Sequence, residues 1–131
     1  MKKKRVLLIE DEKEMNFRLI NRLKESYEVE NAISVEAAIN ALELYPNEFE
    51  LIILDVMMAP GPYNMTETDE GIETGWVLYK NELQKLSVPI IVWTRNSDIF
   101  GKSWGTNVKE KLIKSSDEDQ LVNVARKYIG I

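Results

Sequence analysis

The residues most informative about the fold are Leu51-Ile52-Ile53-Leu54, which are followed directly by Asp55. These four residues are continuously apolar and the run is too short for a helix, which is typical of a strand buried on both faces. Similar runs, Val6-Leu7-Leu8-Ile9 and Ile90-Ile91-Val92-Trp93, come before and after it in the chain. Weaker strand patterns cover residues 27–31 and 108–113. The sequence therefore predicts five strands.

Apolar residues at helical spacing lie between and after these strands. The four stripes are Met15, Leu19, Ile20 and Leu23; Val35, Ala38, Ile39 and Leu42; Trp76, Tyr79, Leu83 and Leu86; and Leu121, Val124, Ala125, Tyr128 and Ile129. Ser34 is a suitable N-cap for the second helix, and Asp117 is a suitable cap or first-turn anion for the last. Alternating strands and helices predict an α/β fold: a single doubly wound, five-stranded parallel sheet of the flavodoxin-like kind, with helices on both faces.

Length and composition fit one globular domain over residues 1–131, with little room for an attached output domain. The chain has no cysteine and no histidine. Their absence excludes disulfides, thiolate or imidazole metal sites, cysteine nucleophiles and serine–histidine catalysis. It also excludes a role as phosphohistidine donor.

Charge and hydropathy argue against nucleic-acid and membrane partners. The formal net charge is −5, whereas a nucleic-acid binder usually carries a basic face. The basic run at 2–5 is interpreted as a solvated leader. Only four apolar residues, 6–9, follow it, too few for a signal peptide or a membrane span, so we expect a cytoplasmic protein.

Chemistry-bearing side chains follow four of the predicted strands. They are the acidic run Glu10-Asp11-Glu12, then Asp55, Thr94 and Lys114. In open α/β sheets, ligands bind at the carboxyl ends of the strands. Carboxylates gathered there repel one another unless a cation neutralises them, and Mg²⁺ suits a site with few carboxylates and several waters.

In this order and strand context, the sequence resembles the receiver domain of two-component response regulators. The resemblance is carried by residues 6–12, 51–58, 89–94 and 112–114, and extends from residue 5 to about 129. It implies that Asp55 is the phosphoacceptor, whose carboxylate forms an acyl phosphate. It also implies that Mg²⁺ is bound directly by Asp11 and Asp55, through a water by Glu10, and by the backbone carbonyl of Met57.

The resemblance also assigns the remaining strand-end residues and the partners. Lys114 would pair with a phosphoryl oxygen, and Thr94 would donate its hydroxyl to another in the switch step. The phosphoryl group would come from a sensor histidine kinase or a histidine phosphotransfer protein. The signal would leave by contact with a protein target or by phosphoryl relay, so the chain is not expected to be an enzyme.

One departure from the family is the length of the segment after Asp55. Residues 56–74 carry no helical pattern, whereas a typical receiver has a short loop here. Structureless loops beyond about 12–15 residues are uncommon and often functional. Two interpretations stay open: a lid or partner surface beside the phosphoacceptor, and a tolerated surface insertion.

Other departures concern the switch. Lys111 stands where the family often has an aromatic residue, and Ser115 replaces the usual proline after the lysine, so we expect a trans peptide bond or a strained cis one. Arg95 replaces a small residue after Thr94; it would either restrict a kinase or supply a second cation to the phosphoryl group. The segment 96–105 predicts a fourth helix of one turn or none.

Aromatic side chains near that segment allow two interpretations. Trp93, Phe100 and Trp104 either substitute for the missing switch aromatic or pack the core and the shortened helix.

Two alternatives compete with a phosphorylated receiver. A phosphatase or phosphotransferase of the haloacid dehalogenase kind needs an acid–base aspartate two residues after the nucleophile, where this chain has Met57. A pseudo-receiver, with the same fold but acting as a phosphorylation-independent binding module, is favoured by Arg95, Lys111 and Ser115. The acidic pair, Asp55, Thr94 and Lys114 oppose it.

Overall fold

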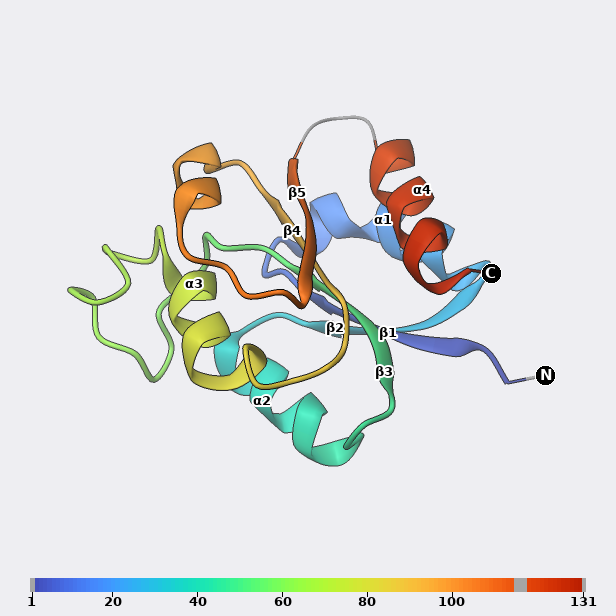
Figure 1. Ribbon diagram of the computed structural model, residues 1–131, viewed down its shortest axis with the longest axis horizontal. Helices are drawn as coiled ribbons and strands as arrows, with labels where there is room; N and C mark the ends of the chain where they lie inside the picture. Colours follow the sequence, from blue (N-terminus) through green and yellow to red (C-terminus); the bar gives the residue numbers. More distant parts are fainter. Residues whose placement is uncertain (1, 115–117, 131) are drawn as a thin grey trace.

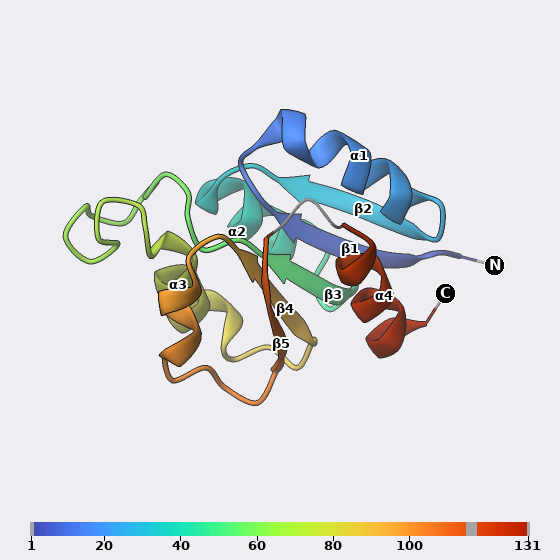
Figure 2. The same cartoon turned by 90° about the horizontal axis from the view of Figure 1, so that it is seen from above.

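A computed structural model describes residues 2–114 and 118–130, without the side chains of 13–16. Five parallel strands form one sheet in the order β2-β1-β3-β4-β5 (Figures 1 and 2). The strands are β1 (Lys4–Ile9), β2 (Tyr27–Ala32), β3 (Phe49–Leu54), β4 (Ile90–Thr94) and β5 (Val108–Ile113). This is the flavodoxin-like strand order, so the predicted fold class is confirmed.

The helices are α1 (Lys13–Lys24), α2 (Val35–Leu44), α3 (Thr74–Leu78) and α4 (Glu118–Ile129). The Ser34 hydroxyl accepts the N–H of Ala37 at 3.0 Å, which confirms the predicted N-cap of α2. The predicted third helix is α3 followed by a π-helical turn over Tyr79–Leu83, and the predicted short fourth helix is a 3₁₀ turn over Ser97–Gly101. Asp117 lies outside the described residues.

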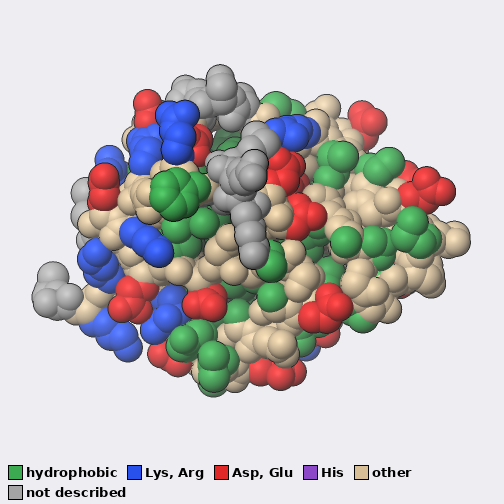
Figure 3. Space-filling model, turned by 180° about the vertical axis from the view of Figure 1, so that it is seen from behind, with side chains coloured by type: hydrophobic (Ala, Val, Ile, Leu, Met, Phe, Trp, Pro, Cys, Tyr) green, Lys and Arg blue, Asp and Glu red, His purple; other side chains and the backbone are tan. Residues whose placement is uncertain are grey.

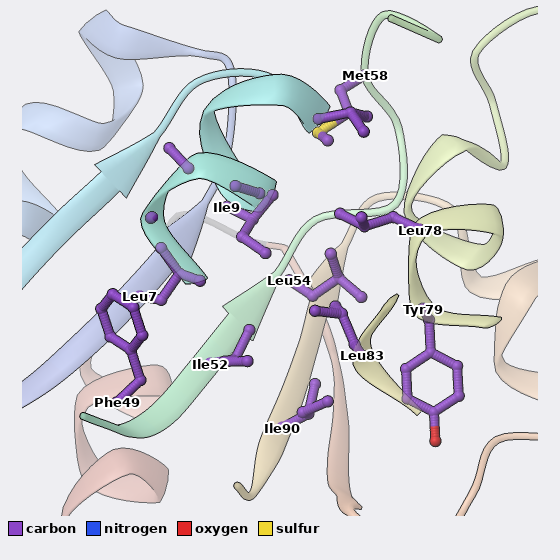
Figure 4. Packing of buried hydrophobic residues seen from close by; sticks show 14 residues of the cluster. Leu7, Ile9, Phe49, Ile52, Leu54, Met58, Leu78, Tyr79, Leu83 and Ile90 are labelled. Carbon is purple, nitrogen blue, oxygen red and sulfur yellow. The ribbon is translucent and has the colours of Figure 1, made fainter. Parts of the chain in front are cut away.

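The sheet separates two apolar cores, because successive side chains of a strand point to opposite faces. Leu7 and Ile9 of β1 pack with α2 and α3 (Figure 4). Val6 and Leu8 pack with α1 and α4, which lie on the other face of the sheet (Figure 1). All four side chains are fully buried. Burial on both faces explains why the strand sequences are continuously apolar.

The basic run at the start of the chain is not simply a solvated leader. The Lys3 ammonium donates to the carbonyl of Lys24 at 2.8 Å, and the Lys4 ammonium donates to the carbonyl of Ile129. These carbonyls end α1 and α4, where cations are stabilising. Basic side chains gather on the side of the molecule where the chain begins (Figure 3).

The long segment after β3 is a loop held by hydrogen bonds, and it ends where α3 begins. At its base, the N–H of Met58 donates to the carbonyl of Gly71 at 3.1 Å, and the hydroxyl of Thr74 donates to the carbonyl of Met58 at 2.7 Å. Within it, the buried Thr68 hydroxyl donates to the carbonyl of Asn64 at 2.9 Å. The prediction of no helix over residues 56–74 is confirmed except at Thr74, where α3 begins. The segment projects beside α3 (Figure 1).

Over the described part of the chain, none of the helices combines the length and apolar character that crossing a membrane requires.

Candidate functional site

Two acidic side chains meet where the central strands end. Ile9 of β1 pairs with Leu54 of β3, so the residues that follow them, Glu10 and Asp55, are neighbours across the sheet. The N–H of Asp55 donates to the carbonyl of Ile9, and the N–H of Glu10 to the carbonyl of Ala32, both at 3.0 Å. The sheet's hydrogen bonding thus continues past the strand ends and fixes the backbone of both residues.

Asp11 completes an acidic cluster with these two residues. One carboxylate oxygen from each of Glu10, Asp11 and Asp55 lies within 4.8 Å of the others. Glu10 and Asp55 are buried, whereas Asp11 is exposed and leaves the cluster open to solvent on its side. Three hard oxygen donors with room for water on one side fit Mg²⁺.

The charge balance of the cluster supports this fit. Burial, and next the charge of Asp55, raise the pKa of Glu10 to about 8, although hydrogen bonds from Lys114 and from the N–H of Glu12 act to lower it. The buried Glu10 and Asp55 carboxylates therefore repel each other, and ionising Glu10 is unfavourable even with Lys114 in contact. A bound divalent cation would relieve that repulsion.

Lys114, the residue after β5, reaches both buried carboxylates. Its ammonium donates to Glu10 and, at 3.2 Å, to Oδ2 of Asp55. It also lies 4.9 Å from the ring centre of Trp93, a cation–π contact that the sequence did not suggest. The side chain of Lys114 is 3% exposed, so this cation is held in place by its carboxylates and by the indole.

Two backbone features hold Asp55 itself. The N–H of Met57 donates to Oδ1 of Asp55 at 3.2 Å, so each carboxylate oxygen has a donor. Gly75, in the first turn of α3, donates its N–H to the carbonyl of Val56 at 2.8 Å. A β-carbon there would lie 2.5 Å from the carbonyl oxygen of Asp55, so only glycine permits this approach. Sequence reasoning missed Gly75; its place at the start of a helical pattern is the one available signal.

Thr94 and Arg95 form the rim of the site at the end of β4. The buried Thr94 hydroxyl accepts the N–H of Asn96 at 3.4 Å, as a strand-end cap would. The Arg95 guanidinium lies 3.4 Å from Oε1 of Glu12, across the mouth of the site. The same Glu12 oxygen is 3.9 Å from the ammonium of Lys114.

Lys111 and two of the aromatic residues discussed with it, Phe100 and Trp104, lie on β5 and in the segment before it. Lys111 is exposed, and its ammonium donates to the carbonyl of Phe100 at 3.3 Å. Trp104 packs edge-on against Trp76 and Tyr79, with ring centres 4.7 and 4.9 Å apart. Trp104 therefore packs this face, as one of the two interpretations expected. Ser115, with its peptide bond, lies outside the described residues.

Comparison with known proteins gives matches among solved structures. Neither a protein-family model nor a curated protein matches the chain. Among solved structures, a two-component response regulator from Clostridium difficile is 19% identical with a TM-score of 0.74, covering 97% of this chain and 96% of that one. The receiver domain of HemR from Leptospira biflexa is 25% identical with a TM-score of 0.68, covering 98% and 96%.

A third structure, the response regulator TrrA of Thermotoga maritima in complex with Mg²⁺ and BeF, is 24% identical with a TM-score of 0.67, covering 98% of this chain and 99% of that one. These three structures, each similar to this chain over nearly its full length, are response regulators or the receiver domain of one. The chain has the receiver-domain fold.

Proposed function

We propose that the chain is a phosphorylation-dependent switch of a two-component system, in which Asp55 receives a phosphoryl group from a histidine kinase or a histidine phosphotransfer protein. The observation that carries the proposal is the convergence of three strand ends. Glu10 and Asp11 after β1, Asp55 after β3 and Lys114 after β5 form one charged cluster, with Lys114 3.2 Å from Asp55. Such a cluster suits a nucleophile that must handle a phosphoryl dianion.

The phosphoryl group passes to a carboxylate oxygen of Asp55 from a nitrogen of the donor's phosphohistidine, or from an oxygen of a small phosphodonor such as acetyl phosphate. A lone pair of an Asp55 carboxylate oxygen forms the new bond to phosphorus, and the bond from phosphorus to the donor breaks, with its electron pair leaving on the donor. The N–H of Met57 and the ammonium of Lys114 orient the carboxylate. Lys114 and the Thr94 hydroxyl are the proposed donors to the phosphoryl oxygens afterwards.

Mg²⁺ is the cofactor that this donor set would hold. Asp11 and Asp55 are the proposed direct ligands, with Glu10 acting through a water and the backbone carbonyl of Met57 completing the protein ligands. When bound, the metal neutralises charge that grows on the transferred oxygens. Signalling then proceeds in the cytoplasm by contact with a protein target or by relay of the phosphoryl group.

Intact mass spectrometry tests the proposal. Incubation with acetyl phosphate and Mg²⁺ should add about 80 Da, the mass of one phosphoryl group. The adduct should disappear when Asp55 is replaced by asparagine and when EDTA removes Mg²⁺. An adduct that persists in D55N would place the phosphoryl group elsewhere.

A pseudo-receiver is the second candidate, and two observations favour it. The ammonium of Lys114 already pairs with Glu10, and the exposed Lys111 stands at the position of the usual switch aromatic. A folded protein that gains no mass, beside a control receiver that does, would support this phosphorylation-independent binding module.

A further inference from the structure

Charges of alternating sign lead from the surface to the phosphoacceptor. The Arg95 guanidinium is 3.4 Å from Oε1 of Glu12, that oxygen is 3.9 Å from the ammonium of Lys114, and the ammonium is 3.2 Å from Oδ2 of Asp55. The carboxylate of Glu12 is not one of the three grouped in the acidic cluster that would hold the metal. One carboxylate oxygen of Glu12 is thus shared by two cations at the mouth of the site.

The Glu12 carboxylate lies between two cations, Arg95 and Lys114, where another anion could take its place. Lys114 is fixed, with a side chain 3% exposed, whereas the side chains of Arg95 and Glu12 are 50% and 37% exposed. Exposed ion pairs are weak, so the contact between Arg95 and Glu12 itself contributes little to holding the two side chains together. A phosphoryl group on Asp55 would bring oxygens with more charge than a carboxylate to the same cations.

We propose that Glu12 occupies this place only in the unphosphorylated protein, and that phosphoryl oxygens on Asp55 replace it as the partner of Arg95. This proposal rests on the proposed function and adds a residue to it. Arg95 becomes a second side-chain cation for the phosphoryl group, beside Lys114. Glu12 holds the guanidinium near the site beforehand and competes with the phosphoryl group for it.

Beryllofluoride is a suitable probe, because its beryllium becomes tetrahedral when it coordinates a carboxylate oxygen and so mimics a phosphoryl group on that oxygen. Its binding in the presence of Mg²⁺ would be followed by tryptophan fluorescence, since Trp93 lies 4.9 Å from the Lys114 ammonium. Replacing Arg95 by alanine should weaken binding about fivefold, a modest value for a half-exposed charged contact. Arg95→Lys should recover part of the loss, because it keeps the charge without the planar fork.

The variant Glu12→Gln should bind beryllofluoride more tightly, by about threefold, because the competing charge is gone. The ion pair between Lys85 and Glu82, 3.6 Å apart, supplies matched controls. Lys85 lies beside Phe49, at the amino end of β3 and far from Asp55. Lys85→Ala and Glu82→Gln change the net charge equally and should bind as the wild type does.

The outcomes separate this proposal from the function on which it rests. Unchanged or tighter binding of beryllofluoride by R95A would overturn the proposed replacement of Glu12 but not the proposed function. Binding by E12Q as weak as that by R95A would do the same, because the Arg95–Glu12 ion pair would then act only as a structural unit. A loss in K85A equal to that in R95A, or a gain in E82Q equal to that in E12Q, also overturns the replacement, because the effect would then be one of net charge. A folded wild-type protein that gives neither a beryllofluoride response nor an acetyl phosphate adduct overturns the proposed function and this replacement together.

Discussion

The tight approach of Gly75 to the backbone around Asp55 gives a stability prediction at the scale of one residue. In Gly75→Ala, the new methyl group would lie 2.5 Å from the carbonyl oxygen of Asp55 and 2.6 Å from the α-carbon of Val56. Both are backbone atoms and must shift, so we expect a loss of about 2 kcal/mol in the free energy of unfolding. Urea titration measures it. The control is Gly101→Ala, where a β-carbon meets nothing within 4 Å, and a loss there as large as in G75A would contradict the steric explanation.

Lys114 carries a second prediction at this scale. Replacing it by methionine leaves Glu10 and Asp55 buried without their shared cation, so we expect a loss of about 3 kcal/mol in metal-free buffer. Added Mg²⁺ should narrow that loss, because it supplies the missing positive charge. Urea titrations with and without Mg²⁺ measure both effects. Lys111→Met, at an exposed position on β5, should lose far less. A loss independent of Mg²⁺ in K114M would argue against a charge effect.

How much of the site the sequence predicts depends on how each residue is placed. Glu10, Asp55 and Lys114 are predictable neighbours, because parallel strands deliver their last residues to the same edge of the sheet. Gly75 and Trp93 are not, since their roles come from an approach between segments that has no sequence period. A helical glycine or an apolar strand residue gives the same sequence pattern whether or not a charged cluster lies beside it.

At the scale of elements, the lysines before and in β1 act as caps for helices distant in the chain. The Lys4 ammonium donates to the carbonyl of Ile129 at the end of α4. Lys4→Ala should therefore cost about 1 kcal/mol and speed amide exchange in the last turn of α4. Urea titration and hydrogen exchange measure the two effects. The exposed Lys2 supplies the matched control. Equal effects of K2A and K4A would mean that Lys4 does not cap α4 and that the basic run is only a solvated leader.

The loop over residues 56–73 has a path that apolar periodicity in the sequence does not predict. Its order comes from single hydrogen bonds, such as those of Thr68 to Asn64 and of Thr74 to Met58, rather than from a repeating apolar face. Serine and threonine bonds of this kind stabilise turns without periodicity. The absence of a helix was therefore predictable, while the compact path of the segment was not. The π-helical turn after α3 was missed for a similar reason, because its apolar stripe also fits an α-helix.

At the scale of the whole molecule, the layered architecture follows directly from the sequence. The three continuous apolar runs became β1, β3 and β4, the three central strands, because a strand buried on both faces has no polar side to show. The two edge strands gave weaker patterns, since their side chains are only partly covered. The fold therefore places the charged cluster at the edge of a sheet that is covered on both faces. A ligand that binds this cluster only in the folded state stabilises the whole chain against unfolding.

This linkage makes the metal site testable without any phosphodonor. A ligand that binds only the folded state at ten times its dissociation constant stabilises that state by about 1.4 kcal/mol, so Mg²⁺ should raise the unfolding temperature of the metal-free protein measurably. Asp11 is exposed, so Asp11→Asn should fold normally yet lose most of the response. The exposed Asp69 gives the control for loss of one charge, and D69N should respond to Mg²⁺ as the wild type does. Calorimetric scans over a range of Mg²⁺ concentrations measure the shift. An equal response in D11N would mean that Mg²⁺ stabilises the fold from somewhere other than the acidic cluster, and would remove the metal from the proposed site.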